Sequence, residues 1–228
     1  MCIRDSTDGV FSMDGFMADL AGICELADAH HALVMVDDAH ATGFIGPGGR
    51  GTPGLHGVTD RVDIVTSTLG KALGGGMGGF VAARQNVVDL LRQRARPYLF
   101  SNALAPALLG GASAGLALVR SSDDRRSHLE ANAGRFRSGM ERAGFELSGA
   151  GHPIIPVMIG DAALATDMAA RLLTHGIYVT AFSYPVVPRG LARIRTQMNA
   201  AHSSDDIDGT IDAFAAVGRE LGLLPTQT

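Results

Sequence analysis

The stretch VDIVTSTLGKALGGGMGG (residues 62–79) decides how this sequence is interpreted. An apolar run typical of a buried strand leads through a Thr-Ser-Thr cluster to Lys71 and then into glycine. Lys71 is the only lysine of the chain, in which the other permanently cationic side chains are arginines. A solvated turn lysine is the simpler interpretation. The alternative is a lysine that forms a Schiff base, because a partly desolvated amine can attack a carbonyl carbon.

A Schiff-base lysine requires a partner group, and the segment ALVMVDDAHATG (residues 32–43) supplies a candidate. Its apolar residues indicate a buried parallel strand that ends at Asp37 and Asp38, with His40 close behind. Ligand groups gather at the carboxyl ends of strands in open α/β sheets, where Asp37 and Lys71 are both expected. A carboxylate there can keep a pyridine nitrogen protonated, so that pyridoxal 5'-phosphate (PLP) acts as an electron sink. The alternative for Asp37 is a loop carboxylate that caps the next turn.

The composition excludes several classes of protein. A length of 228 residues, 46% hydrophobic residues and 30 glycines favour a well-buried α/β core in one large or two modest domains. A net charge of −4 leaves no basic surface for nucleic acid, and no apolar run is long enough to span a bilayer. With only Cys2 and Cys24, a disulfide framework is not expected, and a reducing, cytoplasmic location is.

Apolar periodicity predicts αβ units followed by an α+β unit. In the first part we expect a helix at 16–30, strands at 32–36, 62–65 and 80–84, and helices at 87–94 and 104–119. We expect residues 43–54, GFIGPGGRGTPG, to form an irregular loop because they are rich in glycine and proline. In the second part we expect helices ending at 143 and covering 162–175 and 204–221, and strands at 145–147, 154–159, 177–180 and 192–196.

A change of character at residues 121–126, SSDDRR, marks the expected domain boundary. We therefore predict a doubtful leader at 1–6, a partial cofactor-binding large domain at 7–121, and a C-terminal small domain at 122–228. The opening MCIRDS has no apolar core of the length that a signal peptide needs.

Two arginines in the second part form a candidate anion site. Arg193 and Arg195 alternate with Ile194, so both side chains are expected on the same side of a strand. An arginine fork of this kind suits a substrate carboxylate. The alternative is a salt bridge to a neighbouring acidic helix.

Two other signals are set aside. Gly74, Gly76 and Gly79 satisfy the spacing G-x-G-x-x-G, but the run precedes a strand-like segment instead of opening a helix, so a dinucleotide site is not expected. The histidines at positions 30, 31, 40 and 56 lack the spacing of metal ligands, and we predict no metal site.

Six motifs, in chain order, resemble the α-oxoamine synthases, which are PLP enzymes of the aspartate aminotransferase fold (fold type I). The resemblance covers residues 7 to about 224. The fold that it implies is α/β, with a partial large domain built on a mostly parallel sheet and a C-terminal α+β small domain. The motifs are TDGVFSMDG, VMVDDAHATGFIGPGGRG, DIVTSTLGKALGG, RPYLFSNALAP, GIYVTAFSYPVVPRG and ARIRTQMNAAH.

The resemblance implies a role for each matching residue near the cofactor. Lys71 is expected to bind PLP covalently as a Schiff base, and Asp37 to pair with the pyridine nitrogen. His40 is expected to hydrogen-bond the phenolic oxygen of the cofactor. Ser12 matches a residue near the ring and this oxygen, and Thr68 matches a phosphate ligand.

The same resemblance implies a substrate and an assembly. Arg195 matches the arginine that holds the substrate carboxylate, while Ser101 and Asn102 match residues that reach the phosphate of the cofactor in a neighbouring subunit. The implied reaction condenses glycine with acetyl-CoA to give 2-amino-3-oxobutyrate and CoA, a reaction of threonine degradation, in a homodimer. No nucleic acid or membrane partner is implied.

Two alternatives remain open. A sister synthase of the same family, such as 8-amino-7-oxononanoate or 5-aminolevulinate synthase, uses another acyl-CoA. A non-catalytic, folded remnant is the alternative from a different class. Because the chains of the family extend further at the N-terminus, we expect this chain by itself to bind PLP weakly and to turn over little.

Overall fold

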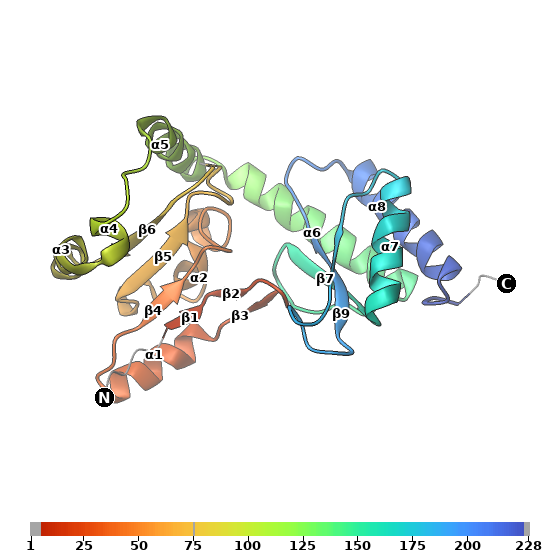
Figure 1. Ribbon diagram of the computed structural model, residues 1–228, viewed down its shortest axis with the longest axis horizontal. Coiled ribbons are helices and arrows are strands. Elements are labelled where there is room, and N and C mark those ends of the chain that lie inside the picture. Colours follow the sequence, from red (N-terminus) through yellow and green to blue (C-terminus); the bar gives the residue numbers. More distant parts are fainter. Residues whose placement is uncertain (1–5, 75, 226–228) are drawn as a thin grey trace. The chain divides into compact units, whose positions relative to one another are not determined.

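The computed structural model describes residues 6–74 and 76–225, which belong to two compact units (Figure 1). The first unit contains the chain up to Phe11 and Met17–Asp123, and the second contains Ser12–Phe16 and the chain from Asp124 onward. Residues 1–5 of the predicted leader lie outside the described residues, and Ser6 begins the first strand. The assignment of the units as cofactor-binding and small domains stays a prediction.

The first unit is organised on a sheet of strand order β1-β4-β5-β6, in which β1, β4 and β5 are parallel and β6 is antiparallel. A hairpin, β2 and β3, follows β1. The strands are β1 Ser6–Asp8, β2 Val10–Phe11, β3 Phe16–Met17, β4 Met35–Asp37, β5 Ile64–Thr68 and β6 Gly79–Ala83. The helices are α1 Leu20–Ala29, η1 Pro47–Gly49, α2 Gly51–Leu55, η2 Thr59–Arg61, α3 Gln85–Arg94, α4 Arg96–Leu99 and α5 Pro106–Arg120.

Helix α1 precedes the central strand β4 and packs against it. The side chain of Asp19 accepts a hydrogen bond from the Gly22 amide at 3.1 Å and so starts the helix. The buried face of α1, with Leu20 and Cys24, packs against Val34 and Val36 next to and within β4. This apolar contact fixes where β4 ends and its polar residues begin. Cys24 is a buried free thiol, and Cys2 lies outside the described residues.

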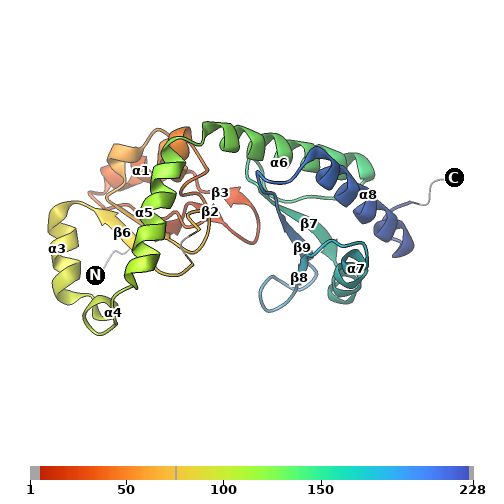
Figure 2. The ribbon, with the colours of Figure 1, turned by 90° about the horizontal axis from the view of Figure 1, so that it is seen from above.

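The second unit is a sheet of strand order β7-β9-β8, antiparallel throughout, with helices packed on it (Figure 2). Its elements are α6 Asp123–Ala143, β7 Ile154–Gly160, α7 Ala162–Thr174, β8 Thr180–Phe182, β9 Ala192–Gln197 and α8 Ser204–Glu220. Helix α8 begins with a capping box, in which the side chains of Ser203 and Asp206 each bond the other residue's backbone amide.

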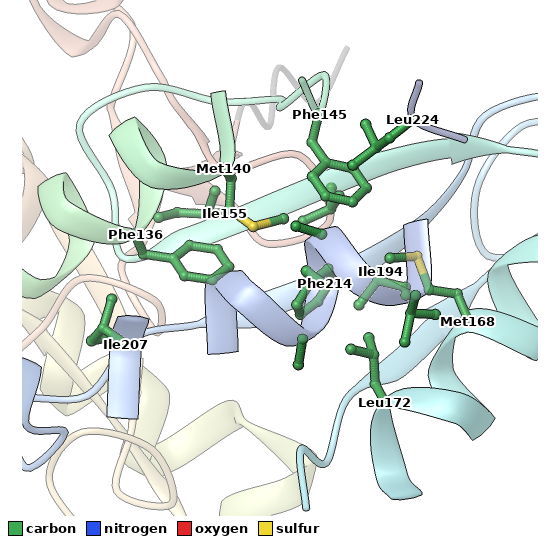
Figure 3. Close-up of a cluster of buried hydrophobic side chains, with 14 of the residues drawn as sticks. Phe136, Met140, Phe145, Ile155, Met168, Leu172, Ile194, Ile207, Phe214 and Leu224 are labelled. Carbon is green, nitrogen blue, oxygen red and sulfur yellow. The ribbon is translucent and has the colours of Figure 1, made fainter. Parts of the chain in front are cut away.

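Aromatic side chains form the centre of the second unit (Figure 3). Phe214 of α8 is fully buried and meets Phe136 and Phe145 edge to face, with ring centroids 6.2 and 6.0 Å apart. Ile194 of β9 points into the same cluster. Because side chains alternate along a strand, Arg193 and Arg195 lie on the other face of the sheet.

Several predicted elements need correction. The helix expected from residue 16 begins at Leu20, because Phe16–Met17 pair in the hairpin instead. The strand expected at 145–147 is wrong, since only Leu147 makes an isolated bridge, to Val157. The strand expected at 177–180 lies at Thr180–Phe182. The irregular loop expected at 43–54 is also wrong, because it contains η1 and α2, and glycines with positive φ make their tight turns possible.

The aromatic cluster yields a prediction for stability. Phe214→Ala is expected to lower the free energy of unfolding of the second unit by about 3–5 kcal/mol, because it leaves a cavity between two aromatic rings. Leu173→Ala is the control, since Leu173 is 58% exposed on α7 and its truncation should change stability by less than about 0.5 kcal/mol. Urea unfolding followed by circular dichroism measures both. Equal effects of the two variants would contradict this description of the core.

Candidate active site

The sole lysine and a histidine meet beyond the ends of two neighbouring strands. The Nζ atom of Lys71 lies 2.9 Å from Nε2 of His40, although the two residues are 31 positions apart. His40 follows β4 and Lys71 follows β5, and these strands run parallel with Asp37 paired to Thr66. The turns that leave both strands therefore emerge at the same edge of the sheet. An amine and an imidazole therefore meet at this edge of the sheet.

The two consecutive aspartates are in different environments. Asp37, the last residue of β4, is exposed, and its Oδ1 atom accepts a hydrogen bond from the Ala39 amide at 2.9 Å. This bond matches the alternative interpretation of Asp37, which is a loop carboxylate that caps the next turn. Asp38 is only 1% exposed and is surrounded by hydrogen-bond donors. Asp37 is therefore the carboxylate that a ligand at this edge can reach.

Thr68 shapes the turn that carries Lys71. Its hydroxyl donates to the Gly78 carbonyl and accepts from the Gly70 amide, both at 3.1 Å. Gly74, Gly76 and Gly78, which follow the lysine, have positive φ, and a Cβ atom at Gly78 would lie only 2.6 Å from Leu104 of the segment before α5. The glycine run then enters β6 and not a helix, so it lacks the strand-to-helix context of a dinucleotide fingerprint.

Ser12 and Arg195 meet in the second unit. Nη1 of Arg195 donates to the Ser12 carbonyl at 3.4 Å, and the guanidinium lies 5.7 Å from the centre of the Phe182 ring. Burial lowers the pKa of Arg195, but an arginine stays protonated at neutral pH. Its neighbour Arg193 is 3% exposed and forms an ion pair with Asp14 at 2.5 Å. The two arginines of the predicted fork therefore have different partners. Arg193 pairs with an acidic residue, but this residue belongs to a hairpin and not to a helix.

Ser101 and Asn102 lie in the exposed bend between α4 and α5. Neither residue is helical, and the short helix α4 that precedes them was not predicted. The role of both residues toward a second subunit stays a prediction.

A set of hydrogen bonds around Asp38 was not predicted from the sequence. Its carboxylate accepts from the hydroxyl of Thr52 at 2.5 Å and from the amide of Thr52 at 3.2 Å, and the hydroxyl of Thr42 lies 3.5 Å away. The available signal was the pair of aspartates itself, because strand alternation turns one of two neighbours inward. Burial raises the pKa of Asp38 above its ordinary value, while the hydrogen bonds from Thr52 and Thr42 partly oppose this shift.

Two kinds of feature are absent from residues 6–74 and 76–225. In this part of the chain, no group of three or more His, Cys, Asp or Glu side chains is placed to hold a metal ion. Nor does any helix of the same residues have the length and apolar character that crossing a membrane requires.

The family model for aminotransferase class I and II matches residues 6–214. This chain is an aminotransferase class I and II family member. The match includes both strand ends, the lysine turn and both arginines, so it covers all of the candidate site residues. It confirms the predicted resemblance and fold class, in which a mostly parallel α/β sheet precedes an α+β unit.

Relatives of this family member resemble it over nearly its whole length. The 2-amino-3-ketobutyrate coenzyme A ligase of Salmonella typhimurium is 57% identical over 219 residues, and an 8-amino-7-oxononanoate synthase of Thermosipho melanesiensis is 43% identical over 218. The solved serine palmitoyltransferase from S. paucimobilis, with a bound PLP–myriocin adduct, is 32% identical with a TM-score of 0.91. Each match covers 96% of this chain but only 55–56% of the relative, so the chain spans about half their length.

The buried carboxylate of this family member yields a prediction of pH dependence. Because folding raises the pKa of Asp38, the folded state takes up a proton before the unfolded state as the pH falls. Asp38 is therefore expected to contribute more to stability as the pH falls. The free energy of unfolding of the unaltered chain, minus that of Asp38→Asn, should increase as the pH is lowered from about 7 to about 4, which is close to the ordinary pKa of aspartate. Urea titrations at several pH values measure it. A difference that is constant or decreases as the pH falls contradicts the assignment.

Proposed function

We propose that this chain carries the active-site lysine, the ring-pairing carboxylate and the carboxylate-binding arginine of a PLP-dependent glycine C-acetyltransferase, also called 2-amino-3-ketobutyrate coenzyme A ligase. The reaction condenses glycine with acetyl-CoA to 2-amino-3-oxobutyrate and CoA. The observation that carries the proposal is the 2.9 Å contact of Lys71 and His40 at the sheet edge where Asp37 ends β4. The identity of 57% to the Salmonella ligase supports this member of the family.

The residues at the edge of the first sheet fit PLP. Lys71 offers an exposed primary amine, and Asp37 offers an exposed carboxylate that can pair with a protonated ring nitrogen. The Thr68 hydroxyl, which lies next to the lysine turn and donates to the Gly78 carbonyl, can bind the phosphate once it turns away from that carbonyl. When bound, PLP supplies a protonated ring that accepts the electron pair left on an α-carbon after a proton is removed.

The chain's own residues have separate roles in the reaction. The Lys71 amine is the base that takes a proton from the α-carbon of glycine and the acid that can return one. His40 Nε2 lies within hydrogen-bond distance of that amine, so it orients the amine and can share a proton with it. Arg195 binds the carboxylate of the amino acid, because its guanidinium is charged and partly desolvated. Ser12, whose carbonyl accepts from Arg195, helps to hold this guanidinium.

A homodimer in a reducing, cytoplasmic setting completes the proposal. Ser101 and Asn102 are the residues that we assign to the cofactor phosphate of the partner subunit. Their exposure in the bend before α5 is compatible with such a contact.

A second candidate is a sister synthase with another acyl-CoA, since an 8-amino-7-oxononanoate synthase is 43% identical. Release of CoA from acetyl-, pimeloyl- and succinyl-CoA with glycine, measured on the purified chain at high protein concentration because turnover is expected to be low, tests the choice. We expect glycine with acetyl-CoA to give the highest kcat/KM by at least about tenfold, which corresponds to about 1.4 kcal/mol. A preference for pimeloyl-CoA or succinyl-CoA would favour a sister synthase.

The catalytic lysine is tested by covalent attachment of PLP. After addition of PLP and borohydride reduction, peptide mass spectrometry is expected to find the cofactor on Lys71, because this is the chain's single lysine. Lys71→Arg is expected to abolish both this attachment and the visible absorbance.

The matched control moves the lysine. The double variant with Lys71→Arg and Arg92→Lys keeps one lysine, but on the exposed surface of α3. If it binds PLP as well as the unaltered chain does, Lys71 has no special role and the proposal fails.

A further inference from the structure

Asp38 occupies a space that is built around its carboxylate. The side chain of Thr52, which donates to it, is fully buried. A Cβ atom added at Gly51 would lie 1.6 Å from Oδ2 of Asp38, and one added at Gly9 would lie 2.5 Å from Oδ1. Only glycine at both positions lets the backbone approach the carboxylate so closely. The contact ties the end of β4 to α2 and to the residue after β1.

The same residue organises the turn that carries His40. The backbone carbonyl of Asp38 accepts hydrogen bonds from the amides of Ala41 and Thr42, at 3.0 and 2.9 Å, and from the Thr42 hydroxyl at 2.9 Å. His40 lies between the residues that these bonds join. Its position therefore depends on how firmly the turn from Asp38 to Thr42 is held.

Thr42 connects this turn to the strand that leads to Lys71. Its hydroxyl accepts a hydrogen bond from the Ser67 hydroxyl at 2.8 Å, and Ser67 is 8% exposed within β5. Thr42 thus uses one hydroxyl as donor toward Asp38 and as acceptor from Ser67. The connection runs from the buried carboxylate and the His40 turn to the base of the lysine turn.

We propose that Asp38 and Thr42 are positioning residues, which hold the His40 turn against β5 so that the imidazole meets the Lys71 amine. Neither residue touches that amine in the contacts described for the chain. The catalytic importance of this arrangement rests on the proposed function, but the arrangement itself is testable without PLP.

Removal of the Thr42 hydroxyl is the most direct disturbance. Valine has nearly the same shape as threonine, so Thr42→Val removes the hydrogen bonds to Asp38 and from Ser67 with little change of volume. It leaves the Ser67 hydroxyl without this acceptor in a buried place, which favours a shift of the turn. Thr42→Ser keeps the hydroxyl and is the matched rescue variant.

The readout is the rate at which acetic anhydride acetylates Lys71 in the purified 228-residue chain without cofactor. Peptide mass spectrometry isolates this rate because no other lysine competes. His40→Ala defines the effect of losing the imidazole. We expect it to change the rate by roughly fivefold, the factor that a hydrogen bond of about 1 kcal/mol supplies. Thr42→Val should change the rate in the same direction and by a similar factor, whereas Thr42→Ser should stay within about twofold of the unaltered chain.

Controls separate this effect from loss of structure. Thr166→Val, at an exposed position of α7, removes a hydroxyl in the second unit and should leave the Lys71 rate unchanged. If Thr42→Val does not fold, Ser67→Ala removes the link to β5 alone and should move the rate in the same direction.

Three results would overturn the proposal. One is a rate in Thr42→Val that equals the unaltered rate while His40→Ala differs. Another is a Thr42→Ser variant that changes as much as Thr42→Val, which would make side-chain volume the cause. The third is an unchanged rate in His40→Ala, because the Lys71–His40 contact would then have no effect to transmit. Failure of the chain to bind PLP would contradict the proposed function. It would not affect the proposal for Asp38 and Thr42, because the acetylation rates are measured without PLP.

Discussion

The parallel pairing of β4 with β5 is the constraint on which the candidate site depends. It aligns Asp37 with Thr66, so both strands end at one edge of the sheet and both following turns emerge there. A slip of one residue would exchange the faces of every side chain on the shifted strand. Asp37 would then turn inward and Asp38 outward. The apolar packing of α1 on β4 and the buried Asp38 carboxylate both oppose such a slip, because each places one face of β4 in the interior.

The neighbouring aspartates show how one strand end can serve stability and chemistry together. Asp38 faces inward, where the donors from Thr52 compensate much of the cost of burying a carboxylate. Asp37 faces outward and stays accessible. A similar division occurs on β9, where Arg193 is buried against Asp14 and Arg195 retains a partly exposed guanidinium. In both pairs, the buried residue is held by hydrogen bonds to its neighbours, and the adjacent or alternate residue stays accessible.

Much of this arrangement was predictable from local patterns. The strand ends, the lysine turn, the parallel relation of the first strands and the long helices follow from apolar periodicity and from glycine and proline. The α2 helix was not predictable in this way, because it depends on contacts of Thr52 with Asp38, 14 residues earlier. The strand at 145–147 failed because apolar alternation there forms a single bridge to β7. The Asp38 network also escaped prediction, since threonines and serines carry little signal until the tertiary fold brings them together.

The central claim is that the strand register places the Lys71 amine against the His40 imidazole. Labelling the chain with ¹⁵N at the lysine Nζ atom gives one side-chain resonance, because the sequence has one lysine. This resonance is predicted to shift as the imidazole titrates, and the shift should vanish in His40→Ala. A resonance that is insensitive to His40 in the folded chain would contradict the account.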